Sequence, residues 1–211
     1  MIDYKKAVAE SLLDIEAVKL QPNEPFTWAS GLKSPIYTDN RLAIAFPAVR
    51  NLIAAGLADL IKTHYPDVEI IGGVATAGIP YAAWVAQIMD LPMIYVRSKP
   101  KDHGAGKQIE GVLTAGQKIV LIDDLISTGG SVLGTVAAAR REGGTVLGVV
   151  SIFSYELAAA DDNFGAVQTP FASLTTYSAL IAAAQAKGLI VESDLETLHQ
   201  WRENPSAWHK S

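Results

Sequence analysis

The sequence contains no cysteine, which excludes disulfide bonds and thiolate chemistry. It has no apolar run long enough to cross a bilayer, and its first residues lack the apolar core of a signal peptide. Basic residues are not in excess, since 17 lysines and arginines stand against 22 aspartates and glutamates, for a formal net charge of −5. A nucleic-acid surface is therefore not expected. These absences favour a cytoplasmic protein with neither membrane nor nucleic-acid partners.

Several motifs of phosphate-binding and hydrolytic enzymes are also missing. We find no G-x-x-x-x-G-K-[ST] and no G-x-G-x-x-G, which argues against a P-loop and a dinucleotide fold. H-E-x-x-H and G-x-S-x-G are absent too. What remains is a chain of 211 residues that is 49% hydrophobic, which is enough for one α/β domain with a full core.

Short apolar runs alternate with helical patterns along the chain. The pattern predicts strands over residues 68–71, 91–98, 118–123 and 145–154. It predicts helices over residues 5–20, 46–64, 79–89 and 131–141, and two more within 175–211. Continuous apolar strands that alternate with helices indicate a mostly parallel sheet with helices on both faces. The chain is expected to form a single domain over residues 1–211, with its terminal segments packed over one end of the sheet.

The stretch KIVLIDDLISTGGSV, residues 118–132, changes character after its strand. Asp123 and Asp124 lie near the carboxyl end of that strand, where ligands bind in such sheets. Hydroxyls and glycines follow in residues 127–131, before a helix whose first N–H groups favour an anion. The paired carboxylates can accept hydrogen bonds from a diol or hold a metal. A ribose 5-phosphate meets both demands, whereas the simpler interpretation is a plain turn in which the aspartates cap the helix.

Two other segments suggest anion binding. GGVATAG, residues 72–78, lies between a strand and a helix, and its glycines allow backbone N–H groups to surround an anion. A tight strand–helix turn would use the same residues. RSKPKDHGAGKQIEG, residues 97–111, has no apolar periodicity and is rich in basic residues, namely Arg97, Lys99, Lys101, His103 and Lys107. Because the chain as a whole is acidic, this local basic excess favours a functional loop over a plain surface loop.

IVLIDDLISTGGS closely resembles the phosphoribosyl pyrophosphate (PRPP) signature of type I phosphoribosyltransferases. SGLKSPIYTDNR, GVATAGIP and VRSKPKDHGAGKQIEG resemble the orotate phosphoribosyltransferases in particular, and the resemblance runs from Phe26 to Ser154. It implies transfer of the phosphoribosyl group of PRPP to orotate, giving orotidine 5′-monophosphate and pyrophosphate. It also implies a small hood made by residues 1–41 and the C-terminal tail, and a homodimer with a shared active site. Mg²⁺ would be carried by PRPP, with no metal held directly by the protein.

The resemblance also implies roles for individual residues. The residues implied in catalysis are Lys101, His103, Asp123 and Asp124. The residues implied in PRPP binding are Arg97, Lys101, His103, Asp123, Asp124, Leu125, Ile126, Ser127, Thr128, Gly129, Gly130, Ser131, Thr76 and Ala77. The residues implied in orotate binding are Ser127, Tyr37 and Thr38.

The chain departs from the family pattern at several basic positions. Many members carry a basic residue where this chain has Ala29, Ala77 and Ser98, and an arginine after the fourth strand, where this chain reads FSYELAAADDNF. The orotate carboxylate thus has no obvious partner, and Arg41 and Lys33 are the candidates. Two alternatives remain: a phosphoribosyltransferase for another base, and a PRPP-sensing regulator of the same fold. The SGLKSPIY segment disfavours the first, and the basic loop disfavours the second.

Overall fold

A six-stranded sheet forms the centre of the protein in the computed structural model, which describes residues 2–28, 31–98 and 108–208. The strand order is β10-β9-β8-β5-β6-β7, and all neighbours are parallel except β7, which runs antiparallel to β6. The strands are β5 (Ile70–Val74), β6 (Met93–Val96), β7 (Ile109–Glu110), β8 (Lys118–Ile126), β9 (Thr145–Ser154) and β10 (Phe171–Thr176). The predicted, mostly parallel α/β sheet is confirmed.

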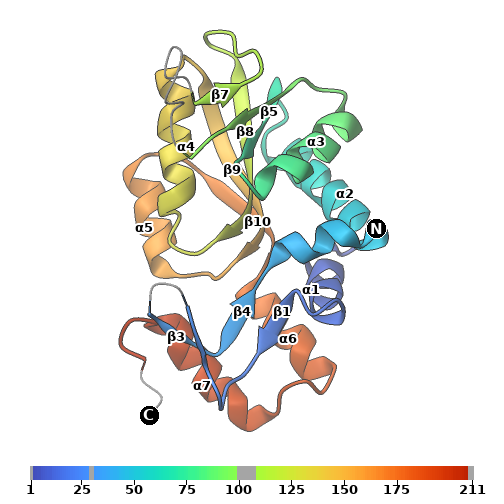
Figure 1. Ribbon diagram of the computed structural model, residues 1–211, viewed down its shortest axis with the longest axis vertical. Helices are drawn as coiled ribbons and strands as arrows, with labels where there is room; N and C mark the ends of the chain where they lie inside the picture. Colours follow the sequence, from blue (N-terminus) through green and yellow to red (C-terminus); the bar gives the residue numbers. More distant parts are fainter. Residues whose placement is uncertain (1, 29–30, 99–107, 209–211) are drawn as a thin grey trace.

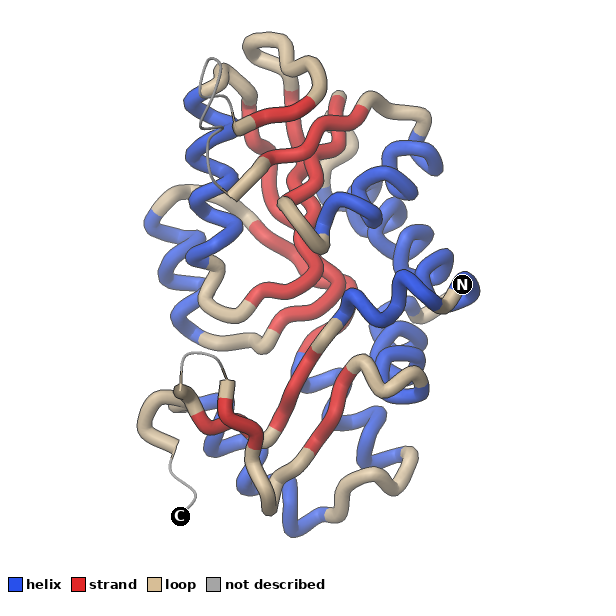
Figure 2. The backbone as a smooth tube through the Cα atoms, in the orientation of Figure 1, coloured by secondary structure: helices blue, strands red, loops and turns tan. Residues whose placement is uncertain are grey.

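Helices cover both faces of this sheet (Figures 1 and 2). On one side lie α2 (Pro47–His64) and α3 (Gly78–Met89), and on the other lie α4 (Gly130–Arg141) and α5 (Ala158–Ala166). The central strand β8 is buried on both faces, because residues 119–122 have no exposed surface. This double burial explains why the strand reads as a continuous aliphatic run and not as an alternating one.

Segments from the N-terminal and C-terminal parts of the chain lie together beyond β10, in the lower part of Figure 1. From the N-terminal side come two small antiparallel ribbons, which pair β1 (Val18–Leu20) with β4 (Ile36–Thr38) and β2 (Phe26–Thr27) with β3 (Lys33–Ser34). From the C-terminal side come α6 (Tyr177–Ala186) and α7 (Glu192–Glu203). The indole of Trp201 on α7 donates a hydrogen bond to the carbonyl of Lys33, at 3.0 Å. This contact joins segments that are far apart in the sequence.

The N-terminal helix is shorter than its pattern predicts. Apolar spacing predicts a helix over residues 5–20, but α1 spans Tyr4–Asp14 and packs against α2, α6 and β10. The chain then turns through Glu16, whose φ is +55°, and continues as β1. The prediction is wrong beyond Asp14 because pairing with β4 supplies Val18 and Leu20 with backbone partners from a distant segment, which local periodicity does not reveal.

The first strand of the sheet lies further along the chain than expected. The prediction placed it at residues 68–71, whereas β5 spans Ile70–Val74 and includes both Gly72 and Gly73. A Cβ on Gly72 would lie 2.6 Å from a methyl of Leu121, and one on Gly73 would lie 2.9 Å from the Cα of Ile79. These glycines therefore allow β5 to pack closely against its neighbours. Within the GGVATAG segment, only residues 75–77 lie between the strand and the helix.

The elements β7, α5 and β10 were also not expected from the sequence. β7 pairs with β6 at the end of the polar stretch, while α5 and β10 follow β9 and complete the edge of the sheet. In the ranges that the structure describes, we find no helix with the length and apolarity needed to cross a membrane.

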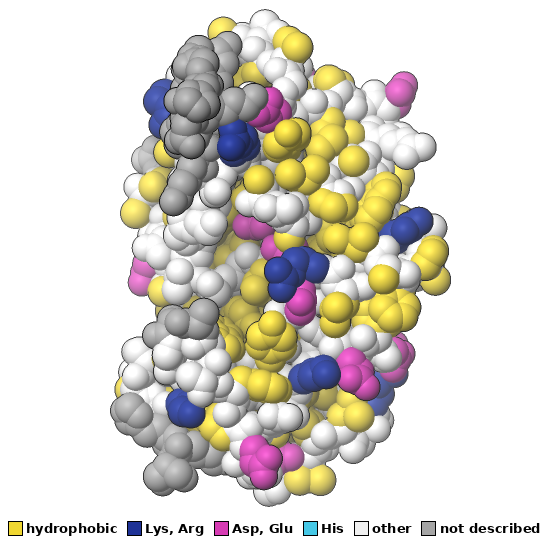
Figure 3. All heavy atoms as spheres, in the orientation of Figure 1, with side chains coloured by type: hydrophobic (Ala, Val, Ile, Leu, Met, Phe, Trp, Pro, Cys, Tyr) yellow, Lys and Arg dark blue, Asp and Glu magenta, His cyan; other side chains and the backbone are white. Residues whose placement is uncertain are grey.

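The connections along the sheet reverse direction between β5 and β8. From β5 the chain passes through α3 to β6 on one side, and it returns to place β8 on the other side of β5. The carboxyl ends of these two neighbouring strands form the crevice in which ligands of open α/β sheets bind. In Figure 3 this face is hollowed where the sheet body meets the smaller lower part.

Candidate active site

Two adjacent acidic side chains lie near the end of β8. The strand continues past them to Ile126, so they belong to the strand itself. Asp123 is 9% exposed, and its Oδ1 accepts a hydrogen bond from the backbone N–H of Asp124 at 2.9 Å. Burial, reinforced by the charge of Asp124, raises the pKa of Asp123 to about 7. Burial also raises the pKa of Asp124. The pair is therefore poorly solvated until hydroxyl donors or cations meet it.

The backbone next to this pair is fixed by a polar chain from two other elements. Asn40, which begins the 3₁₀ helix η1 (Asn40–Ala45), donates from Nδ2 to the carbonyl of Asp124 at 2.7 Å. The hydroxyl of Tyr81 on α3 donates in turn to the carbonyl of Asn40, at 3.2 Å. The position of the acidic pair is thus tied to both η1 and α3, and Asn40 was not among the predicted site residues.

The loop after β8, residues 127–129, leads into α4. Gly129 precedes the helix with φ +79°, and no side chain caps the helix start with a hydrogen bond. A Cβ at this glycine would lie 2.5 Å from the ring of Phe164 on α5. Both the left-handed conformation and this close packing require glycine. The first N–H groups of α4 are consequently available to an anion, as the sequence predicts.

The turn between β5 and α3 lies beside the same strand end. It consists of residues 75–77 and includes the predicted PRPP contacts Thr76 and Ala77. α3 begins at Gly78, where a Cβ would collide with the carbonyl oxygen of Ile122. This close approach places the uncapped start of α3 against β8, next to Asp123.

A cavity of about 420 Å³ opens next to the loop between β8 and α4. It contains the three residues predicted to bind orotate, Tyr37, Thr38 and Ser127. Its full lining is Thr27, Trp28, Tyr37, Thr38, Leu125, Ser127 and Tyr155. The rings of Trp28 and Tyr155 lie 5.3 Å apart. Apolar and aromatic walls with a few hydroxyls suit a flat heterocycle.

One polar atom of this cavity is weakly satisfied in the described ranges. Thr38 Oγ1 is buried and forms no hydrogen bond of good geometry there, although it interacts with Tyr155. Buried hydroxyls in folded proteins are nearly always paired, so a weakly satisfied one in a cavity is a candidate for ligand contact. Trp28 and Tyr155 were not predicted as site residues. For Tyr155, its place directly after β9, at the carboxyl edge of the sheet, was an available signal.

The basic segment is only partly described. Arg97 follows β6, and its backbone N–H donates to the carbonyl of Gln108 at 2.9 Å, while the Gln108 amide returns a hydrogen bond to the carbonyl of Arg97 at 3.1 Å. Arg97 therefore stands at the base of the segment, beside the carboxyl end of the sheet. Lys101 and His103 lie outside the described residues.

The two candidates for the orotate carboxylate have other partners. Arg41 forms a two-point ion pair with Asp39, with Nε–Oδ1 at 2.6 Å and Nη2–Oδ2 at 2.9 Å. Lys33 donates from Nζ to the hydroxyl of Thr27 at 2.8 Å. Neither residue lines the cavity next to the loop between β8 and α4.

The acidic pair, the two uncapped helix starts and the aromatic cavity all lie at the strand ends beside the point where the chain reverses direction along the sheet. The Phosphoribosyl transferase domain family model matches residues 46–170, more than half of the chain. The chain belongs to this family and, within it, to the orotate phosphoribosyltransferases. A relative from Lactiplantibacillus plantarum named orotate phosphoribosyltransferase is 57% identical over 208 residues, which cover 99% of this chain and 98% of the relative.

Solved structures agree with this assignment. Orotate phosphoribosyltransferase from Aeropyrum pernix is 25% identical, with a TM-score of 0.73, and the match covers 87% of this chain and 99% of that one. UMP synthase from Leishmania donovani is 26% identical, with a TM-score of 0.80. That match covers 93% of this chain but only 42% of the longer Leishmania chain.

Proposed function

We infer that the protein transfers the phosphoribosyl group of PRPP to orotate, giving orotidine 5′-monophosphate and pyrophosphate. The observation that carries this inference is the order of sites along the end of β8. The acidic pair comes first, and the uncapped loop and the aromatic cavity then share Ser127. This arrangement matches a phosphorylated ribose joined to a base, and the full-length relatives named orotate phosphoribosyltransferase support it.

In this proposal the ribose phosphate lies along the β8–α4 connection. Asp123 and Asp124 accept hydrogen bonds from the ribose hydroxyls, which relieves the cost of their burial. Residues 127–131 bind the 5′-phosphate through backbone N–H groups and hydroxyls at the start of α4. Leu125 and Ile126 contribute backbone next to the ribose.

The pyrophosphate lies towards the β5–α3 turn. Thr76 and Ala77 surround it from the start of α3, and Arg97 approaches from β6. Lys101 and His103 complete the cationic set, as the resemblance implies. Ribosyl transfer passes through a cationic, oxocarbenium-like state while negative charge grows on the departing pyrophosphate. Cations placed at the leaving group stabilise that charge.

Mg²⁺ is the proposed metal and is carried by PRPP. Across the described ranges, no group of three or more histidine, cysteine, aspartate or glutamate side chains could hold a metal ion. The donor set at the site, two buried carboxylates with raised pKa values, fits ribose hydroxyls that are themselves bound to a cation. When bound, the metal adds positive charge at the leaving group.

The pyrimidine occupies the aromatic cavity. Tyr37 and Thr38 offer backbone and hydroxyl groups from β4, and Ser127 offers a hydroxyl from the opposite side. Since β4 belongs to the terminal segments, we propose that residues 1–41 and the C-terminal tail form a hood over the base within a single domain of residues 1–211.

A homodimer with a shared active site is part of the same proposal. Exposed apolar side chains support it, since Leu42, Phe46 and Ile88 are each at least 43% exposed on η1, at the start of α2 and on α3. Figure 3 shows hydrophobic side chains gathered over the side of the molecule where α2 and α3 lie. A cytoplasmic location, without nucleic-acid or membrane partners, stays a prediction from the sequence.

The direct test is incubation of the protein with Mg²⁺, PRPP and a panel of bases, followed by ultraviolet absorbance. We expect orotate to be consumed with release of pyrophosphate, and uracil, adenine, guanine and hypoxanthine to remain. Consumption of a purine or of uracil in preference to orotate would show a phosphoribosyltransferase for another base. PRPP binding without turnover of any base would instead show a regulator.

A further inference from the structure

The aromatic cavity lacks a cation for the carboxylate that distinguishes orotate from uracil. None of its lining residues is a lysine or an arginine, in the part of the chain that the structure describes. A carboxylate taken from water into such a cavity needs a charged or well-placed hydrogen-bond partner. A basic residue on a neighbouring described element would supply such a partner.

A second cavity, of about 520 Å³, adjoins the first. The two share Trp28 and Ser127, and the second is bounded by the start of α5 and by α7 with the residues after it. Arg202, on α7, lines this second cavity, and it is the only lysine or arginine in the described lining of either cavity. Arg202 therefore lines the second cavity, and Tyr37 and Thr38 line the first, with Trp28 and Ser127 common to both.

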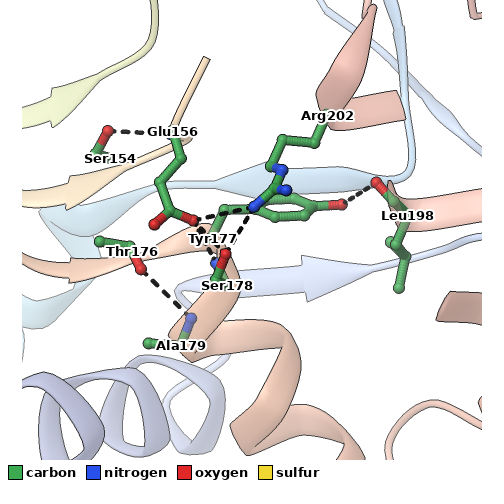
Figure 4. Close-up of polar contacts among 8 residues, drawn as sticks. All are labelled: Ser154, Glu156, Thr176, Tyr177, Ser178, Ala179, Leu198 and Arg202. Carbon is green, nitrogen blue, oxygen red and sulfur yellow. Dashed lines mark hydrogen bonds and ion pairs between the residues drawn. The ribbon is translucent and has the colours of Figure 1, made fainter. Parts of the chain in front are cut away.

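Arg202 is held by a polar cluster that fixes one end of its guanidinium group (Figure 4). Its Nη1 donates to the hydroxyl of Ser178 at 2.7 Å and lies 3.6 Å from Oε2 of Glu156. That Glu156 oxygen also accepts hydrogen bonds from the backbone N–H of Ser178, at 2.8 Å, and from its hydroxyl, at 2.5 Å. The cluster joins Glu156, two residues after β9, to the start of α6 and to α7, so three parts of the chain set the position of Arg202.

The carboxyl group of Glu156 stays ionised, so it can pair with the guanidinium of Arg202. Burial alone would raise its pKa, but the hydrogen bonds from Ser178 and the charge of Arg202 bring the pKa below its usual value. Its backbone adopts φ +54°, and its N–H donates to the hydroxyl of Ser154 at 3.1 Å. The carboxylate thus remains charged and fixed beside the site.

The other edge of the guanidinium is available. Nε and Nη2 of Arg202 form no hydrogen bond or ion pair with residues in the described ranges. These two nitrogens present parallel N–H groups at the spacing of a carboxylate. The arginine is 30% exposed, at the wall of the cavity.

We propose that Arg202 determines the specificity for a pyrimidine that carries a carboxylate, by binding that carboxylate through Nε and Nη2 at the junction of the two cavities. Glu156 and Ser178 act as positioning residues, because they hold Nη1 and leave the opposite edge free. This inference rests on the proposed function. It also explains how the chain binds a carboxylate without an arginine after β9, since Glu156, the second residue after that strand, holds an arginine from α7.

The test compares two products that differ only in the carboxylate. Binding of orotidine 5′-monophosphate and of uridine 5′-monophosphate is measured by calorimetry for the wild type, Arg202→Gln and Arg202→Lys. We expect Arg202→Gln to weaken binding of orotidine 5′-monophosphate about 10- to 100-fold and to change binding of uridine 5′-monophosphate by less than about threefold. Arg202→Lys keeps the charge but loses the two-nitrogen edge, and it should give an intermediate loss.

A matched control is Arg140→Gln. Arg140 also ties a helix to a loop, through hydrogen bonds from its guanidinium to Val167 and Thr169, but it lines neither cavity. It should leave the ratio of the two product affinities unchanged. If Arg202→Gln weakens both products equally, Arg202 only supports α7, and the proposal is wrong. It is equally wrong if neither affinity changes.

Failure of the proposed function would look different. In that case the wild type itself would not convert orotate and PRPP, whatever the variants show. Should Arg202→Gln fail to fold, as judged by thermal denaturation, Arg202→Lys decides the question, because retention of wild-type preference for orotidine 5′-monophosphate would overturn the two-nitrogen contact.

Discussion

Replacement of Asp123 by asparagine should stabilise the ligand-free protein at neutral and higher pH while it abolishes activity. In the folded protein, burial and then the charge of Asp124 raise the pKa of Asp123 to about 7, from a usual value of 3.8. The folded state therefore binds more protons than the unfolded state between these two values. The contribution of Asp123 to stability is fully present below the lower value, and it is lost as the pH rises towards the upper one.

The size of this effect follows from the same two values. With roughly 1.4 kcal/mol for each pKa unit, the step from 3.8 to about 7 sets an upper limit of about 4 kcal/mol. Asparagine does not titrate, and its Oδ1 can still accept the hydrogen bond from the N–H of Asp124. The variant should therefore keep the fold and lose the pH-dependent cost.

Urea denaturation of the wild type and Asp123→Asn between about pH 5 and about pH 8 measures the difference directly. We expect the stability advantage of the variant to grow across this range and then level off. Asp124→Asn should show a trend of the same sign, because burial raises the pKa of Asp124 too. A difference in stability that stays constant with pH would refute the reasoning, since the burial of Asp123 would then carry no electrostatic cost.

Three further predictions concern packing, metal and assembly. Gly78→Ala should lose roughly 1–3 kcal/mol of stability, because its Cβ collides with the Ile122 carbonyl. Gly134→Ala, with open space around it on α4, should gain about 0.5–1 kcal/mol. Equal effects of the two substitutions in urea denaturation would contradict the packing argument. Calorimetric titration with Mg²⁺ alone should give little binding, and tight binding without PRPP would make the aspartates direct ligands. Lys101→Ala and Asp124→Asn should each be weak, the latter at least about tenfold down in turnover. Mixing the two with subunit exchange should restore one site per dimer, whereas exchange by mass without recovered activity would exclude a shared site.

The sequence was sufficient where local pattern and burial agree. The strand over residues 145–154 was predicted with the bounds that β9 has, and the helix after the acidic pair begins one residue earlier than expected and ends at Arg141 as predicted. In both places a continuous aliphatic run or a clear helical period is bounded by glycines. The acidic pair and loop could be assigned for the same reason, since they form one local segment.

The sequence was insufficient where contacts between distant segments decide. The helix predicted to reach Leu20 ends at Asp14, because β1 finds its partner in β4. The base cavity joins Trp28, Tyr155 and residues near β8, which no local pattern connects. The proposed role of Arg202 could not be predicted either, because it depends on Glu156. That residue lies 46 positions earlier and contacts Arg202 only in the folded chain.

The contact between the N-terminal and C-terminal segments bears on how the protein folds during synthesis on the ribosome. Residues 118–141, which contain the acidic pair and the loop, emerge from the ribosome before α7, because synthesis runs from the N-terminus. The indole of Trp201 reaches the carbonyl of Lys33, and its ring lies 5.7 Å from that of Trp28, only after the last helix is made. A nascent chain therefore contains the proposed ribose-phosphate contacts before it has the helix proposed to distinguish one base from another.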